Sequence, residues 1–521
     1  MAACSPNACP AATAADSESP PEPFLEPSRK HRRTEKSRVG AAYPHSCSVA
    51  TGTPGPASAP RVSIVTGGGL SEEQDRYDQL RIPSSQTTPD AILAWPVFQH
   101  RWPENLITDP LFEAELSDRE TEEPLSHLDA SLQVGSVNEE QVPALIQNFL
   151  RHVHIKNPVV DAEMLISHAH QISKEGVKWD AASCLVILAC ALGCVAKPFH
   201  VDISDSPYIS IKRDNNALRN GETYFACARM RFGLLKAGTT TTQCHFLAGV
   251  YLMYTMRPLS AWMQFRSASE SYHLYLDFQK SRQGRPTAVP LTIKQRSLEQ
   301  GLYWSCYKSE CEFRKEMNFP DSCLVDVRYR DLHPLPPRTD AAGPVSNESI
   351  AGRDFSLSTG KALNMQEQEN SWFYYLTEIT LRRICNSVLN VLYTLDYKEW
   401  TDERVSYMVR AATEFEQQLQ DWYNGLPSPL QYEKNKTPSE ELPCFSVIEA
   451  MPTRHRHHGS WYAIRFNISA SFLILAAVES GSLPIRSDWR SLLSYNVERL
   501  SYWEAEAPGV LEALRVMRAY F

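Results

Sequence analysis

Apolar side chains recur at the spacing of an α-helix in one segment after another from residue 139 onward. In the first of these segments they fall on a single helical face, at Leu145, Ile146, Phe149, Leu150 and Val153. The period-two alternation that a half-buried β-strand requires is nearly absent. The sequence therefore predicts an all-α fold, a large multi-helix domain.

Further helices are expected wherever this periodicity returns. The apolar run at residues 184–196 is too short to span a bilayer and indicates a buried core helix. Asp180 can cap that helix, and Gly193 permits a neighbouring helix to approach closely. The other expected helical ranges are 223–236, 241–256, 259–276, 291–317, 366–397, 401–423, 459–479, 489–505 and 510–520.

Composition divides the chain into four parts. Residues 1–88 hold eleven prolines and few aromatic residues. Such a stretch cannot bury enough apolar surface to offset the entropy of ordering, so it is predicted to be a disordered N-terminal arm. Residues 332–364 are rich in Pro, Gly and Ser and are expected to form a linker. The linker separates a first helical half, residues 89–331, from a second, residues 365–521.

The predicted arm contains one strongly basic segment, residues 29–38. Six of its ten residues are cationic: Arg29, Lys30, Arg32, Arg33, Lys36 and Arg38. This density is typical of a nuclear import signal or of an arm that touches phosphates. A solvated charge run that only keeps a tail in solution is the alternative.

Charge and cysteine usage exclude several classes of function. The net charge of −9 argues against a chain that binds nucleic acid over its whole surface. Thirteen cysteines, an odd number, occur without a recognisable secretory signal, which favours a reducing compartment. No C-x-x-C motif occurs, and the arm holds only Cys4, Cys9 and Cys47, so a binuclear zinc cluster lacks its six thiolates. No phosphate-binding loop, nucleophile elbow or metalloprotease motif is present either, and we expect no catalytic site, metal or cofactor.

Three segments admit both a functional and an ordinary structural interpretation. The histidines and acids of residues 152–170 lack the i,i+4 spacing of a helical metal site, so we interpret them as interhelical side chains. Residues 454–458 are expected to form an exposed basic turn before a helix. The acidic and apolar stretch 111–129 could recruit a partner as an amphipathic segment, but a surface turn is preferred.

Several segments, taken in order, resemble one known protein family. They are 149–161 (FLRHVHIKNPVVD), 184–196 (CLVILACALGCVA), 221–228 (GETYFACA), 243–256 (QCHFLAGVYLMYTM) and 371–384 (SWFYYLTEITLRRI). The most specific segment is 298–312 (LEQGLYWSCYKSECE), continuing to Asn-Phe-Pro at 318–320. Together they resemble the fungal-specific transcription factor domain, the middle homology region of zinc-cluster regulators, over roughly residues 90–480. Within the most specific segment, Tyr303 and Trp304 are expected to supply core area, and Glu310 and Arg314 a helix ion pair.

The resemblance implies a nuclear transcriptional regulator, of the kind that controls a metabolic or secondary-metabolite gene cluster. Its implied partners are the transcriptional machinery or a DNA-binding relative, and it allows a small-molecule effector but no membrane. Because the zinc cluster is missing, promoter DNA would be contacted only indirectly or weakly. The segment 461–467 also lacks the Arg-Pro step expected of the family.

Alternative functions remain open at this stage. The chain could be a co-regulator without a zinc cluster that modulates a DNA-binding partner. A zinc-cluster exon upstream of Met1 is a further hypothesis, which transcript sequencing across the start would test. An all-helical enzyme is disfavoured because no Asp-Asp-x-x-Asp run or similar set of convergent carboxylates occurs.

Overall fold

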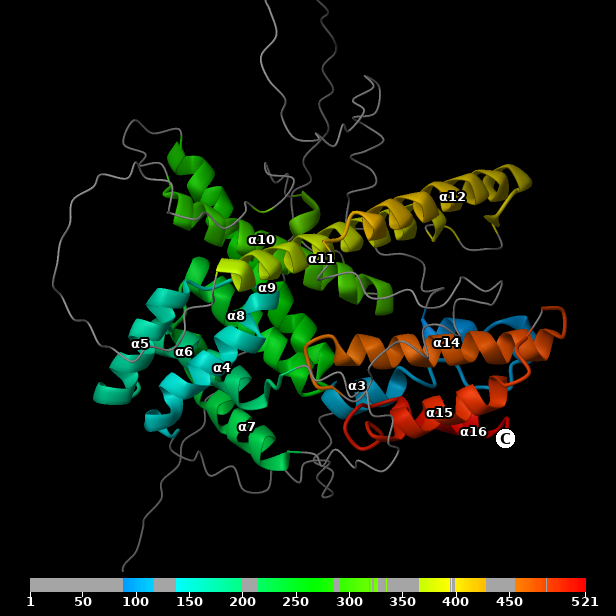
Figure 1. The fold of residues 1–521 in the computed structure, drawn as a ribbon, viewed down its shortest axis with the longest axis horizontal. Coiled ribbons are helices and arrows are strands. Elements are labelled where there is room, and N and C mark those ends of the chain that lie inside the picture. The colour runs from blue at the N-terminus through cyan, green and yellow to red at the C-terminus, as the bar shows by residue number, and fades with distance from the viewer. Residues whose placement is uncertain are drawn as a thin grey trace, which may run out of the picture. The chain divides into compact units, whose positions relative to one another are not determined.

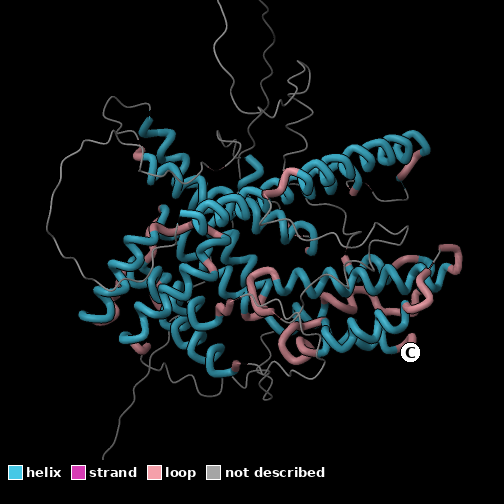
Figure 2. Tube along the Cα trace, viewed as in Figure 1, coloured by secondary structure: helices cyan, strands magenta, loops and turns pink. Residues whose placement is uncertain are grey.

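The computed structural model describes residues 88–116, 137–198, 214–283, 291–317, 319–320, 323–326, 334, 365–393, 395, 399–427, 455–483 and 485–521. Every regular element in these ranges is a helix, with no strand (Figure 2), which confirms the all-α prediction. The predicted arm, apart from Thr88, and the predicted linker, apart from Pro334, lie outside the described residues. All described residues belong to one compact unit.

The first half of the chain contributes elements up to η5 (Figure 1). They are α2 (Pro89–Leu93), η1 (Pro96–Phe98), α3 (Asp109–Leu116), η2 (Glu139–Gln141), α4 (Val142–His152), η3 (His154–Lys156), α5 (Ala162–Glu175), α6 (Ala181–Val195), α7 (Asn215–Arg229), η4 (Phe232–Leu234), α8 (Thr239–Tyr254), α9 (Pro258–Gln283), α10 (Ile293–Glu316) and η5 (Cys323–Asp326). The second half contributes α11 (Met365–Leu392), α12 (Asp402–Asn424), α14 (Ser460–Ser480), α15 (Trp489–Ser501) and α16 (Val510–Arg518).

Two helices differ clearly from their predicted ranges. Helix α7 begins eight residues before the expected range 223–236, because Asp214 accepts a hydrogen bond from Ala217 N and caps a polar first turn that carries no apolar period. It ends at Arg229, and the three-residue turn η4 follows. Helix α9 continues seven residues beyond the expected end at 276, through an exposed turn in which Lys280 pairs with Asp277.

Helix α6 lies at the centre of the first half and is buried along nearly its whole length. Asp180 caps it as predicted, accepting a hydrogen bond from Ser183 N at 2.7 Å. Gly193 also confirms its prediction, because a Cβ there would lie 2.3 Å from the carbonyl oxygen of Leu145 on α4. Around α6 pack α4, α7 and α8.

The described residues of both halves share one hydrophobic core, which runs from Ile92 to Met517 in sequence. Helix α14 packs against α2, η1, α15 and α16. By length and composition, α14 could cross a membrane, but most of its apolar window is buried within the fold. This burial is the pattern of a core helix.

Helices α11 and α12 form an antiparallel pair (Figure 1). Arg404, at the start of α12, donates to the carbonyl oxygen of Val391 near the end of α11, at 2.5 Å. Trp422, at the end of α12, donates through Nε1 to the carbonyl oxygen of Thr377, at 3.2 Å. The pair has a small apolar cluster of its own, formed by Val391, Ala411 and Phe415.

Candidate functional site

The import candidates of the sequence analysis lie outside the described residues. They are Arg29, Lys30, Arg32, Arg33, Lys36 and Arg38. The structure therefore brings none of them to a site, and nuclear import stays a prediction.

A line of buried and half-buried charges runs between α10, α11 and α14, and we call it the charged seam. Its members are Lys308, Glu312 and Glu316 on α10, Glu378 and Arg382 on α11, and Arg465 on α14. Charges four residues apart lie on one face of a helix, which aligns the α10 members opposite those of α11. The seam joins residues of the two predicted halves.

Lys308 and Glu378 form the first pair of the charged seam along α10 and α11. The Lys308 side chain is 1% exposed, and its Nζ lies 2.6 Å from Glu378 Oε2 and 3.3 Å from the carbonyl oxygen of Lys156. The Tyr374 hydroxyl donates to the other Glu378 oxygen at 2.8 Å. Burial alone would raise the pKa of Glu378, but the charges of Lys308 and Arg382 hold that pKa well below its ordinary value. Glu378 is therefore a carboxylate at neutral pH.

Two further ion pairs extend the charged seam toward α14. Arg382 Nη2 lies 2.6 Å from Glu312 Oε1, and Arg465 Nε lies 2.9 Å from Glu316 Oε2. The pairs Lys308–Glu378 and Glu312–Arg382 join residues that are both seventy apart in sequence, so α10 and α11 run parallel in constant register. Each cation therefore has a matched carboxylate, as buried charges require.

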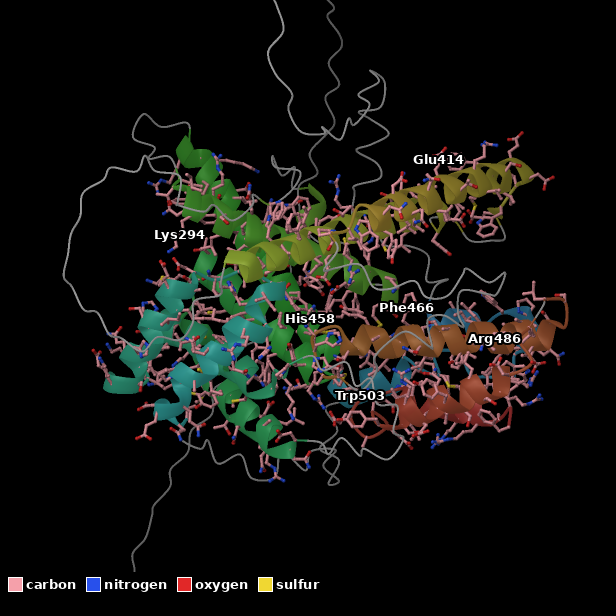
Figure 3. All side chains as sticks on the ribbon, in the orientation of Figure 1. Lys294, Glu414, His458, Phe466, Arg486 and Trp503 are labelled. Carbon is pink, nitrogen blue, oxygen red and sulfur yellow. The ribbon has the colours of Figure 1, made fainter. Side chains whose placement is uncertain are left out.

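The segment before α14 does not form the exposed basic turn that the sequence predicted. Arg456 donates to the carbonyl oxygen of Tyr254 at 2.7 Å, pairs with Glu506, and lies over the Trp503 ring. His458, labelled in Figure 3 just before α14, is buried, and burial, together with the positive charge of Lys308, lowers its pKa well below the ordinary value. The prediction was wrong because interior acceptors, which periodicity cannot reveal, hold these polar side chains.

The acids and histidines of residues 152–170 have separate structural contacts. Asp161 caps α5 and, with Glu163, holds Lys294 at 2.9 and 2.8 Å. The Nδ1 atom of His154 is enclosed without a hydrogen-bond partner among the described residues, and burial lowers its pKa to about 4. His168 lines a surface pocket of about 220 Å³. Within the described ranges, no group of three or more His, Cys, Asp or Glu side chains could hold a metal ion.

The stretch 111–129, for which a surface turn was preferred, is helical as far as Leu116, and residues 117–129 lie outside the described part. Glu115 accepts hydrogen bonds from Leu259 N and Ser260 N at 3.1 and 2.8 Å and so satisfies the first turn of α9. This part of the segment therefore has an internal structural contact.

The residues of the most specific resembling segment lie in the core. Tyr303 and Trp304 are 6% and 5% exposed and pack edge to face, as expected of core aromatics. Glu310 accepts a hydrogen bond from Ser269 at 2.5 Å, while Arg314 donates to Asn386 and Asn390 on α11. The contacts of Arg314 therefore reach from α10 to α11.

Sequence reasoning missed the charged seam, although a signal was present. Lys308, Glu312 and Glu316 repeat every four residues, as do Glu378 and Arg382, within segments that otherwise supply core residues. A charge that recurs on the apolar face of a helix is expected to meet an opposite charge there. The charged seam contains ion pairs and hydrogen bonds. Next to it, burial raises the pKa of the Cys311 thiol to about 12, so this thiol is a poor nucleophile.

No family model, curated protein or solved structure matches this chain. The resemblance described above is therefore carried by the quoted residues alone.

Proposed function

We propose that the protein is a nuclear transcriptional regulator of fungal type that acts through its helical domain. The observation that carries the proposal is the ordered run of segments, over roughly residues 90–480, that resembles the fungal-specific transcription factor domain. Control of a metabolic or secondary-metabolite gene cluster is the biological setting that this resemblance suggests.

The packing of three of those segments supports the proposal. Residues 149–161, 298–312 and 371–384 meet where η3 lies against α10 and α11. The Ser371 hydroxyl donates to the carbonyl oxygen of Ile155 at 2.6 Å, and a Cβ on Gly301 would lie 2.3 Å from the Pro158 oxygen. Because a close-packed junction is sensitive to the size of every residue in it, these three segments are expected to act as one structural unit.

The mode of action follows from what the arm contains and what it lacks. The basic segment 29–38 supplies charge for import, while the three cysteines of the arm are too few for a zinc cluster. We infer that the regulator contacts promoter DNA weakly by itself and is held there by a DNA-binding partner. A small-molecule effector or a protein partner would act on the helical domain.

Chromatin occupancy and localisation of the tagged full-length protein test the proposal. Replacing the six cations of residues 29–38 with Gln should move the protein from the nucleus to the cytosol and abolish promoter occupancy. A matched control replaces six exposed cations of the helical domain, among them Lys174, Lys280 and Arg410, and should leave both readouts unchanged. Cytosolic residence of the unmodified protein, with an unchanged transcriptome after its deletion, would refute the proposal.

The missing zinc ligands favour a second candidate function, a co-regulator that never touches DNA. A mobility-shift assay with the purified full-length chain separates the two. Retention of promoter fragments without any added partner contradicts the co-regulator, whereas retention only with a DNA-binding partner supports it.

A further inference from the structure

Helix α12 presents two different faces. One faces α11, where Ala411 and Phe415 are buried and Trp422 donates its indole N–H to α11. Among the described elements, α11 is the one against which α12 packs extensively. Most other side chains of α12 are exposed among the described residues, Glu414 among them (Figure 3).

A second line of side chains, apolar except for one glutamate, follows the exposed part of α12, and we call it the α12 stripe. Its members are Val405, Val409, Ala412, Glu416, Leu419 and Tyr423. Their spacing alternates between four and three residues, which keeps them on one side of the helix over about 27 Å. Val405, Val409 and Leu419 are 41%, 61% and 37% exposed.

The arrangement, more than the exposure itself, distinguishes the stripe. Single exposed aliphatic residues are ordinary on protein surfaces. Here three of them share one heptad-like line, and the positions flanking it on the open side are neutral and polar: Ser406, Thr413, Gln417 and Gln420. A line of this spacing is the seam by which a helix packs against a second helix.

The charge of α12 selects the kind of helix that fits. Asp402, Glu403, Glu414, Glu416 and Asp421 outnumber the two arginines of the helix, and Arg404 already donates to the carbonyl oxygen of Val391. Glu416 lies within the stripe itself, and the stripe contains no basic residue. The same stripe of a second copy of this chain would therefore bring another acid and no cation to meet Glu416, whereas a basic helix would neutralise it.

We propose that the α12 stripe docks a basic amphipathic helix of a partner protein. The partner's apolar seam covers Val405, Val409 and Leu419, and a Lys or Arg of that seam pairs with Glu416. This inference rests on the proposed function, in which the helical domain receives a protein partner, and it names the chemistry of that partner.

Binding of synthetic helical peptides to the full-length chain tests the docking surface. The probe is a fluorescent peptide of three heptads, with Leu at the seam, one central seam Lys, and Lys on its outer face. Anisotropy should show saturable micromolar binding to the unmodified chain. Val409→Glu should weaken it at least about tenfold, since a charge would be buried in the apolar seam.

Two substitutions of equal charge separate specific docking from general attraction. Glu416→Lys should weaken binding of the Lys peptide at least about tenfold. The same variant should instead bind a peptide that carries Glu at the central seam position. Glu414→Lys changes the net charge equally but lies outside the stripe, and should alter binding less than about twofold. Circular dichroism of each variant checks that the exposed substitutions leave the fold intact.

Three results would overturn the inference. They are absence of peptide binding, equal losses for Glu414→Lys and Glu416→Lys, and sedimentation showing a dimer of the chain that Val409→Glu dissociates. The peptide assay uses no cells, so peptide binding by a protein that never enters the nucleus would refute the proposed function and leave the docking surface standing.

Discussion

The charged seam predicts a large loss of stability when Glu378, the partner of the buried Lys308, is neutralised. Glu378→Gln keeps the shape of the side chain but removes the carboxylate that lies 2.6 Å from Lys308 Nζ. Among the described residues, the carbonyl oxygen of Lys156, at 3.3 Å, is then the remaining hydrogen-bond acceptor of the Lys308 ammonium. The Lys308 side chain, only 1% exposed, cannot recover the lost interaction from water.

The expected magnitude follows from the cost of an unpaired buried charge. Removing one partner of a buried ion pair costs about 3–5 kcal/mol, because the other charge stays buried without a partner. We therefore expect Glu378→Gln to lower the free energy of unfolding by about 3–5 kcal/mol, measured from urea titrations at pH 7 with the slope compared between variants.

Removing both charges should restore part of the stability. In Lys308→Met/Glu378→Leu the ion pair is gone, and apolar replacement of a buried pair is often neutral or stabilising. The Tyr374 hydroxyl and the Lys156 carbonyl, which belong to half-buried residues, each lose a hydrogen bond worth about 0.5–1.5 kcal/mol, so we expect a stability between that of the single mutant and that of the unmodified chain. As a control, Lys280→Met removes an exposed pair with Asp277 and should cost under about 1 kcal/mol. A loss below about 1 kcal/mol for Glu378→Gln, or a double variant no more stable than the single one, would refute the reasoning.

Three further predictions test other parts of the fold. His154 binds its proton near pH 4 in the folded chain but near 6.5 when unfolded, so its contribution is complete above about pH 6.5 and is lost as the pH falls toward 4. The unmodified chain should therefore lose unfolding free energy between pH 7 and pH 5, and His154→Gln should reduce that loss by about 1–2 kcal/mol, a range lowered because the residue is partly exposed. Equal pH profiles for the unmodified chain and the variant would contradict this. Gly301→Ala should lower the free energy of unfolding in urea by about 2–3 kcal/mol, because the added Cβ would clash with Pro158. Gly233→Ala, with open space around it, should leave stability unchanged, and equal effects of the two substitutions would contradict the packing argument. Asp180→Ala should lower stability by about 1 kcal/mol in thermal unfolding by uncapping α6, and an unchanged midpoint would speak against the cap.

Local patterns in the sequence predicted the helices well where an apolar face or a cap defines them. Asp180 and Gly193 were assigned their roles from residue type alone, because a cap and a close approach depend on one side chain and its immediate backbone. The polar first turn of α7 and the exposed end of α9 were missed, because a solvated turn carries no apolar period.

The candidate site was less accessible to sequence reasoning. That Lys308 would be buried, that its partner would be Glu378, and that Arg456 would reach Tyr254 and Glu506 all depend on contacts between distant segments. A charge on an apolar helix face indicates a buried partner but cannot name it, because the pairing is set by which helices are neighbours and in what register.

By itself, the sequence determined that this chain is all-α, where most of its helices lie, and which residues resemble a regulatory family, since helical periodicity and motif order are properties of local sequence. Only the tertiary structure decided that α10 and α11 run parallel across a seam of matched charges, and that one line of α12 stays open. The physical reason is that burial, which gives an ion pair its strength and an apolar stripe its significance, is a property of the packed chain.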